Sequence, residues 1–339
     1  MVACGRAAEA PRRPRGDGPL LIVAGAGTGK TRTLVYRVAH LIEHGIRAER
    51  ILLLTFTRRS AQEMLARAER LVGSASRSVQ GGTFHDTAHR LLRRFGPQAG
   101  LPGDFTILDQ GDAADLMQLS RAQLGLGDKT KRFPRKETLH HVYSRHVNTE
   151  YPVGAILREE YPRFVEFEED FARVFADYTE RKLARNLVDY DDLLLYWALL
   201  VEQVPAVADQ IAGLYSHILV DEYQDTNTLQ ARILKGMCRG HRNITVVGEE
   251  ERRLMYVAMT RARDHLAVTF PFNVYATRRG ANYNLAQLSR FLDRGVVRTF
   301  QQVVLETPGE LPPAEAPAHL PPVDLRALLR ARFGPDAPQ

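Results

Sequence analysis

A glycine-rich stretch that ends in Lys-Thr is the strongest chemical signal in this sequence. It reads A-G-A-G-T-G-K-T and directly follows a short apolar run. Glycines allow backbone N–H groups to turn inward around phosphate oxygens, and the N-terminus of a following helix adds partial positive charge. Lys30 would reach the β- and γ-phosphates of a nucleoside triphosphate, and the Thr31 hydroxyl would ligate Mg²⁺. The expected phosphate-loop residues are Ala24, Gly25, Ala26, Gly27, Thr28, Gly29, Lys30 and Thr31.

A second stretch, I-L-V-D-E-Y-Q-D-T-N at 218–227, supplies carboxylates directly after another apolar run. A phosphate-binding loop needs an acidic group at the end of a neighbouring strand to hold Mg²⁺ and orient water. We expect Asp221 to bind Mg²⁺ through its water shell and Glu222 to act as general base. The alternatives are a chance glycine-rich turn and an acidic cluster that only caps a strand. Together the motifs favour nucleotide hydrolysis, and no acceptor-site signature in the sequence indicates a kinase.

Apolar runs and helical periodicity indicate the elements that position these motifs. Helical patterns extend from Thr31 to about His44 and from Ser60 to Val72. The apolar runs typical of buried strands lie at 19–25, 51–56, 216–222 and 243–248. Continuous apolar strands alternating with helices are typical of a parallel sheet that is covered on both faces. The expected fold class is therefore α/β, with a doubly wound parallel sheet.

Composition and pattern divide the chain into several segments. Residues 1–18 are rich in Arg and Pro and are expected to form a disordered lead-in. The other expected segments are the first α/β domain in two parts, 19–110 and 201–248, a helical insertion without a clear strand, 111–200, a separate segment, 249–305, and a Pro-rich tail, 306–339. Within 249–305, residues 251–270 have the pattern of a helix followed by a strand. The tail is expected to be disordered apart from a short helix at Val323–Phe333.

The overall composition is that of an ordinary globular protein. The 339 residues are 44% hydrophobic and 25% charged, which allows about two domains. The net charge of +6 is too small to identify a polyanionic partner, and the excess of Arg over Lys fits genome composition equally well. Cys4 and Cys238 are too few and too far apart for a disulfide framework or a zinc site. With no signal peptide and no bilayer-spanning run, we expect a cytoplasmic protein without membrane contact.

The string D-E-Y-Q-D-T-N, combined with the glycine-rich loop, resembles the UvrD/Rep/PcrA family of superfamily 1 DNA helicases. Further blocks match in the same order, and the resemblance covers about residues 19–300. These blocks are T-F-T-R-R-S-A-Q-E-M (55–64), G-T-F-H (82–85), F-T-I-L-D (105–109), V-D-Y-D-D-L-L (188–194) and E-E-E-R-R-L-M-Y-V-A-M-T-R-A-R (249–263). The resemblance implies a P-loop NTPase with a RecA-like parallel sheet flanked by helices, a helical insertion and a truncated second RecA-like domain, of which 249–305 would be the remnant.

The resemblance also implies roles for individual residues. Lys30, Thr31, Asp221 and Glu222 would form the hydrolytic centre, with ATP and Mg²⁺ as cofactors. Gln224 would lie near the γ-phosphate, Arg32 against the nucleotide, and Arg261 would be an arginine finger that neutralises transition-state charge. The residues implied to line the path of single-stranded DNA are Thr55, Phe56, Thr57, Thr83 and His85. Aromatic faces and hydroxyls suit binding that is independent of base sequence.

Several of these residues also have plain structural interpretations. Phe56 would equally suit a hydrophobic core, and His85 a structural hydrogen bond. Arg58 and Arg59 would form a solvated helix start, and the stretch Met259–Arg263 an ordinary amphipathic helix. Asp191 and Asp192 would simply cap a helix.

The sequence departs from the family pattern in four ways. Ala24 replaces the first glycine of the phosphate loop, and no glutamine before Gln62 is available to read adenine. After Gly248 the block Q-S-I-Y-x-F-R-G-A, which couples ATP to DNA in the family, is missing. The 58 residues from Glu249 to Glu306 are also too few for a second motor domain, since each βαβ unit takes roughly 30.

Three functions remain open at this point. The leading expectation is an ATP-dependent DNA helicase with impaired unwinding, for which the resemblance implies 3′→5′ polarity. The alternatives are a nucleotide-dependent single-strand binder and an inactive remnant. Stimulation of ATP hydrolysis by single-stranded DNA would distinguish the helicase from the binder and the remnant. A cooperative melting transition would distinguish the binder from the remnant. The sequence does not determine the protein partners or the oligomeric state. It also does not determine the pathway, which could be repair, replication restart or plasmid replication.

Overall fold

A computed structural model describes residues 18–23, 29–126, 133–248, 267–269, 273–275, 283–285 and 324–333. The chain forms two compact units, each built from separate stretches of sequence. Unit 1 comprises 1–83, 214–225 and 241–301, and unit 2 comprises 84–213, 226–240 and 302–339. The expected insertion at 111–200 lies inside unit 2, which begins much earlier, at Phe84.

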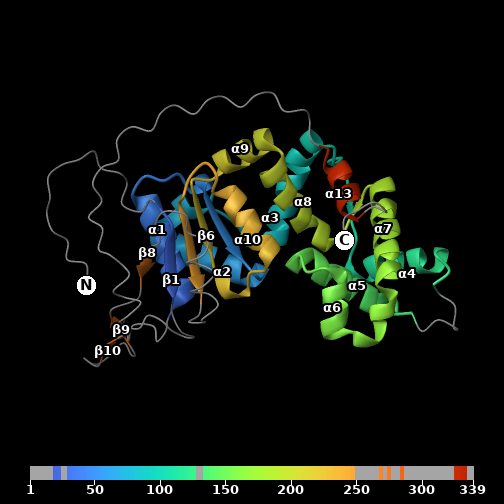
Figure 1. The fold of residues 1–339 in the computed structure, drawn as a ribbon. Coiled ribbons are helices and arrows are strands. Elements are labelled where there is room, and N and C mark those ends of the chain that lie inside the picture. The colour runs from blue at the N-terminus through green and yellow to red at the C-terminus, as the bar shows by residue number, and fades with distance from the viewer. Residues whose placement is uncertain are drawn as a thin grey trace, which may run out of the picture. The chain divides into compact units, whose positions relative to one another are not determined.

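Unit 1 is organised around a sheet of six described strands in the order β3-β2-β6-β7-β1-β8, in which every neighbouring pair is parallel. Strands from distant parts of the sequence lie side by side in it, blue beside yellow and orange in Figure 1. The strands are β1 (Leu20–Val23), β2 (Ile51–Thr55), β3 (Gln80–Thr83), β6 (His217–Val220), β7 (Ile244–Gly248) and β8 (Ala267–Thr269). The expected parallel sheet is therefore confirmed.

The core of unit 1 explains why the sheet is parallel and covered. Strand β2 is buried at all five positions, so both of its faces are shielded from water, as in sheets with helical crossovers. On one face Ile51 and Leu53 join apolar residues of α1 (Lys30–Glu43) and α2 (Arg58–Val72), including Leu34 and Met64. Helices α1 and α2 match the expected helices to within two residues.

Unit 2 is mostly helical, as its charged and aromatic sequence indicates. Its helices are α3 (Phe84–Phe95), α4 (Gln110–Gln123), α5 (Lys136–Thr149), α6 (Val153–Glu160), α7 (Glu168–Ala184), α8 (Tyr190–Gln203), α9 (Pro205–Leu214), α10 (Thr228–Met237) and α13 (Leu325–Phe333). Helix α8 packs against α3 and α10. A Cβ on Gly236 of α10 would run into Val201 of α8, so glycine permits this close approach.

Three features differ from or refine the expectations. The helical region contains a short strand, β5 (Leu187–Val188), which pairs in parallel with β4 (Thr106–Ile107), so the expectation of no strand there is wrong. Strand β8, from the segment assigned to a remnant second domain, instead extends the first sheet beside β1. Helix α13 confirms the short helix expected in the tail, and its Leu325, Leu329 and Phe333 are buried. Strands β9 (Asn273–Tyr275) and β10 (Tyr283–Leu285) form an antiparallel pair.

Candidate active site and nucleic-acid interface

The carboxyl edge of the unit 1 sheet gathers the residues singled out in the sequence. Val23 of β1 pairs with Gly248 of β7, and the phosphate loop follows β1 directly. Thr55 of β2 is the register partner of Thr83 of β3, and the Asp221 backbone N–H donates to the Leu54 carbonyl at 3.0 Å. Parallel strands all end at one edge, and ligands bind there in open α/β sheets.

The two chemical motifs meet at this edge. The Nζ of Lys30 lies 3.4 Å from Oε2 of Glu222, and the Thr31 hydroxyl donates to Oδ2 of Asp221 at 3.2 Å. Gln224 donates from Nε2 to the same Glu222 oxygen at 2.5 Å. The structure therefore brings together Lys30, Thr31, Asp221, Glu222 and Gln224, as expected from separate parts of the sequence.

Backbone conformation supports this arrangement at two positions. Gly29 precedes α1 with φ of 91°, in the left-handed region that favours glycine, so the chain turns sharply into the helix. Glu222 has φ of 49°, which is uncommon for a residue with a side chain. A turn in which the Asp225 N–H donates to the Glu222 carbonyl at 2.9 Å holds it there. Backbone strain of this kind is typical of functional sites.

Asp221 fits the requirements of a Mg²⁺ ligand. It is buried, and its Oδ1 has no hydrogen-bond partner among the described residues. Burial, and then the charge of Glu222, raise the pKa of Asp221 above its ordinary value, so a cation beside it would be favourable. Within the described ranges no group of three or more His, Cys, Asp or Glu side chains is arranged for a metal.

The exposed side of α1 carries Arg32. Its guanidinium donates from Nε and Nη2 to the hydroxyl of Tyr36, at 3.2 and 2.8 Å. Ala24, Gly25, Ala26, Gly27, Thr28 and Arg261 lie outside the described residues, so their expected roles stay predictions.

The expected DNA residues occupy strand ends and helix starts. In unit 1, Thr55 is buried and donates to the Thr57 carbonyl at 2.8 Å, while exposed Thr57 caps α2 by accepting from the Ser60 N–H at 3.1 Å. Phe56 is half-buried between them, so the core interpretation does not hold fully. Thr83, which ends β3, is also half-buried.

In unit 2, His85 contacts Tyr190, a residue to which the sequence alone assigned no role. The His85 ring meets the Tyr190 ring edge-on, with centroids 5.8 Å apart, and Tyr190 is 50% exposed at the first position of α8. Burial lowers the pKa of His85, so its ring favours the neutral form. The available signal for Tyr190 was its place inside V-D-Y-D-D-L-L, but only the fold puts it beside His85.

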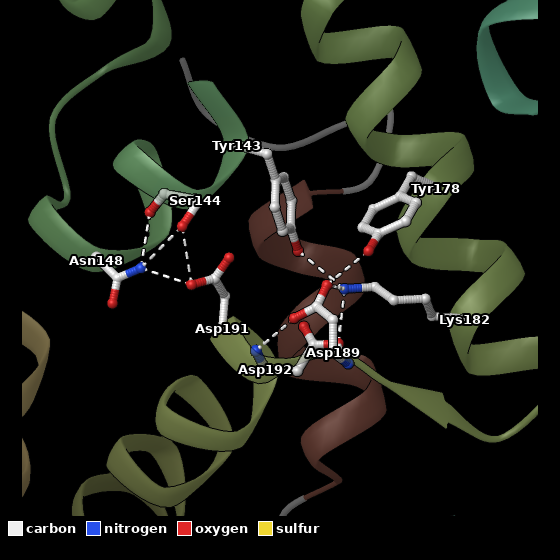
Figure 2. A network of polar contacts seen from close by, with 8 residues as sticks. All are labelled: Tyr143, Ser144, Asn148, Tyr178, Lys182, Asp189, Asp191 and Asp192. Carbon is white, nitrogen blue, oxygen red and sulfur yellow. Dashed lines mark hydrogen bonds and ion pairs between the residues drawn. The ribbon is translucent and has the colours of Figure 1, made fainter. Parts of the chain in front are cut away.

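A buried cluster holds the start of α8. Asp189 caps the helix by accepting from the Asp192 N–H at 2.8 Å, and Asp192 accepts from the Asp189 N–H at 3.1 Å. Lys182 of α7 donates to both carboxylates at 2.6 Å and to the Tyr143 hydroxyl at 3.2 Å, as Figure 2 shows. The structural interpretation of Asp192 as a capping residue is thus confirmed. Asp191 instead accepts from Ser144 and Asn148.

Electrostatics differ among these acids. Although burial alone would raise the pKa of Asp189, the Lys182 ammonium lowers it overall. Burial, reinforced by the charge of Asp189, raises the pKa of Asp192 to about 7. Burial likewise raises the pKa of Asp191. The cluster thus keeps Lys182 charged between two carboxylates of unequal acidity.

A parallel sheet flanked by helices, with a lysine, a threonine and two acids at its carboxyl edge, has the architecture of a RecA-like α/β domain. The profile of the UvrD/REP helicase N-terminal domain matches residues 6–252, and the chain belongs to this family.

Individual relatives agree with that assignment. The chain is 34% identical over 240 residues to the ATP-dependent DNA helicase PcrA of Staphylococcus epidermidis strain RP62A, covering 70% of this chain and 32% of that protein. It is 32% identical over 241 residues to PcrA of Bacillus subtilis strain 168, with the same coverage. The chain thus spans about a third of the length of the curated relatives it matches. No helix in the described part of the chain has the length and apolar character needed to cross a membrane.

Proposed function

We propose that this chain hydrolyses ATP with Mg²⁺, binds single-stranded DNA and acts as an ATP-dependent DNA helicase of 3′→5′ polarity. The observation that carries the proposal is the meeting of two motifs about 190 residues apart, with Lys30 beside Glu222 and Thr31 bonded to Asp221. The relatives named ATP-dependent DNA helicase PcrA support the same activity.

The side chains at the carboxyl edge of the sheet would have different roles in hydrolysis. Thr31 and Asp221 would hold Mg²⁺, which when bound neutralises phosphate charge. Lys30 would exchange its contact with Glu222 for the β- and γ-phosphates and so leave that carboxylate to accept a proton from water. Gln224, which already donates to Glu222, would keep the carboxylate oriented toward that water. Arg32 is proposed to lie against the nucleotide, and Arg261 to act as the arginine finger.

On the nucleic-acid side we propose one set of contacts within unit 1 and, considered separately, one within unit 2. Thr55 and Thr83 end β2 and β3, and Phe56 and Thr57 directly follow β2. Their hydroxyls and ring suit phosphate contact and base stacking. His85 and the exposed ring of Tyr190 add a second aromatic contact. Such contacts read no base edges, which suits a protein that binds any sequence.

The second candidate is a nucleotide-dependent single-strand binder with little unwinding. Strand β8 favours it, because this strand comes from beyond Gly248 and completes the first sheet instead of a separate motor domain. The absence of the family's coupling block from the sequence points the same way. We therefore propose that unwinding by this chain is weak.

Mg²⁺-dependent ATP hydrolysis, measured with and without single-stranded DNA, tests the proposal. Lys30→Ala serves as the blank, because it removes the phosphate contact. DNA-stimulated turnover that is lost in this variant would support the hydrolase, and strand separation by the unaltered chain would further support the helicase over the binder. ATP binding and DNA binding without turnover would support the binder alone. Failure of the chain to bind either ligand would overturn both.

A further inference from the structure

Three polar side chains in unit 2 form a continuous hydrogen-bonded series. Asn227, the residue that ends D-E-Y-Q-D-T-N, donates from Nδ2 to the Oδ1 of Asn148 at 2.9 Å. Asn148 of α5 donates from Nδ2 to the Oδ1 of Asp191 at 2.6 Å, and Ser144 donates to the same oxygen at 3.0 Å. Figure 2 shows Ser144 and Asn148 turned toward Asp191. Asp191 is the residue after Tyr190.

The orientation of each amide follows from its neighbour. Asn227 caps α10, so its Oδ1 must face the Gln230 N–H, from which it accepts at 2.8 Å. Its Nδ2 is then left to donate, and Asn148 must present an oxygen to it. The Nδ2 of Asn148 consequently faces Asp191 and also donates to the Ser144 carbonyl at 2.9 Å. A flip of either amide would oppose two donors or two acceptors, so the series has one consistent arrangement.

The two ends of the series belong to different functional motifs. Asn227 follows Glu222 by five residues and starts α10, which packs against α8 and α5. Asp191 lies in the first turn of α8, next to Tyr190, whose ring meets His85. Asp191 is buried and acidic, so it requires donors, and Ser144 and Asn148 supply them. Asn148 is the only link of the series that belongs to neither motif.

We propose that Asn148 is a positioning residue that couples nucleotide binding to DNA binding, through Asn227 at the end of the acidic motif and Asp191 beside Tyr190, the exposed ring proposed to contact DNA. The inference rests on the proposed function, since it assumes a nucleotide at Glu222 and DNA at Tyr190. A shift of the acidic motif would move Asn227, and the bonds through Asn148 would transfer that shift to the start of α8. Coupling of this kind is a change in the affinity for one ligand caused by the other.

The chain offers variants that separate coupling from support of the fold. Asn227→Asp keeps the capping oxygen, and Asp caps helices as well as Asn, but it replaces the Nδ2 donor by an acceptor. Asn148→Ala removes the middle link. Asn227→Ala removes both the cap and the donor, so its difference from Asn227→Asp reports the loss of the cap alone.

The experiment measures the affinity of the full chain for a fluorescent oligothymidylate with and without Mg²⁺ and a non-hydrolysable ATP analogue. The ratio of the two dissociation constants is the coupling. We expect Asn148→Ala and Asn227→Asp each to reduce the ratio by about threefold or more. The double variant should lose no more than either single one, because both break the same series. DNA affinity without nucleotide, and nucleotide affinity without DNA, should change less than about twofold.

Three results would overturn the inference. They are a ratio of one in the unaltered chain, an unchanged ratio in the variants, and additive losses in the double variant. If Asn148→Ala lowers the melting temperature, the result with Asn227→Asp decides whether coupling is lost, because this variant keeps the cap of α10. Binding of each ligand separately with no coupling contradicts the inference and leaves the proposed function standing, whereas failure of the unaltered chain to bind either ligand contradicts both.

Discussion

A lysine near two acidic side chains occurs twice in the described part of this chain, in very different surroundings. Lys30, Asp221 and Glu222 gather at the carboxyl edge of the sheet, where the Glu222 side chain is 36% exposed and Asp221 keeps an oxygen without a partner among the described residues. Lys182, Asp189 and Asp192 are almost wholly enclosed, at 1–2% exposure. Among the described residues, every fully buried side-chain nitrogen or oxygen of these three residues has a hydrogen-bond partner.

The difference between the two clusters lies in how completely their polar atoms are hydrogen-bonded within the protein, and this distinguishes a structural cluster from a candidate active site. In the buried cluster Lys182 donates to three oxygens and each carboxylate also accepts a backbone N–H, so these side chains bond mainly to one another. At the sheet edge Oδ1 of Asp221 has no partner among the described residues, and Glu222 has a strained backbone conformation. The same residue types therefore serve folding in one place and are available for chemistry in the other.

The largest expected effect tests the sheet edge. Glu222→Gln keeps the size of the side chain but removes the proton acceptor, so ATP hydrolysis should fall by about 10²–10⁴-fold. The affinity for Mg²⁺–ATP should stay within a few-fold, since Lys30 and Thr31 remain. Steady-state turnover and equilibrium nucleotide binding are the two measurements. Turnover that survives at the original rate would remove Glu222 from the role of base.

The next effect tests the buried cluster. Lys182→Met leaves two buried carboxylates without their counter-ion, and the free energy of unfolding should fall by about 3–5 kcal/mol. Thermal and urea melts followed by circular dichroism measure this loss. Lys30→Met is the matched control and should melt nearly as the unaltered chain does, because Glu222 remains hydrated.

A triple variant without the two carboxylate charges tests why Lys182→Met lowers stability. Adding Asp189→Asn and Asp192→Asn to Lys182→Met removes the unpaired charges and should recover part of the lost stability. No recovery would mean that packing of the lysine stem, and not its charge, supports the fold.

A smaller effect concerns one hydroxyl. Tyr178 donates to Asp189 at 2.7 Å inside the cluster, so Tyr178→Phe should cost about 1.5–3 kcal/mol of stability, as for a buried bond to a charged group. Tyr36→Phe removes an exposed hydroxyl in unit 1 and should cost less than about 0.5 kcal/mol. Equal losses in the two variants would show that burial does not distinguish the regions.

The smallest effect is a dependence on pH at the sheet edge. Because burial raises the pKa of Asp221, its carboxylate takes up a proton at a higher pH than an exposed Asp, whose pKa is about 3.9. As pH falls, Mg²⁺–ATP affinity should begin to decline earlier than for an ordinary carboxylate, while the unliganded fold gains stability through the same proton uptake. Mg²⁺ titrations from neutral to acidic pH, with Asp221→Asn as the pH-insensitive control, measure it. A decline confined to the ordinary Asp range would contradict the raised pKa.

Much of the sheet and of the nucleotide motifs follows from local sequence. Continuous apolar runs predict β1, β2, β6 and β7 because strands covered on both faces have no polar side, and the periodicity of α1 and α2 predicts their bounds closely. Lys30, Thr31, Asp221 and Glu222 were predictable because phosphate and magnesium chemistry restricts both residue type and the position relative to a strand end.

The remaining features depended on long-range packing. No local pattern indicates that β8 pairs with β1, since three residues suit many sheet edges, or that Lys182 lies between Asp189 and Asp192, since a lysine in a helix is usually exposed. The side chain of Tyr190 and the series through Asn148 are likewise unremarkable in sequence. By itself the sequence determined which residues could do chemistry at the ends of strands, because local geometry and residue type suffice for that. Only the tertiary structure decided which acids are saturated and which stay available, because hydrogen-bond saturation depends on neighbours that are distant in the chain.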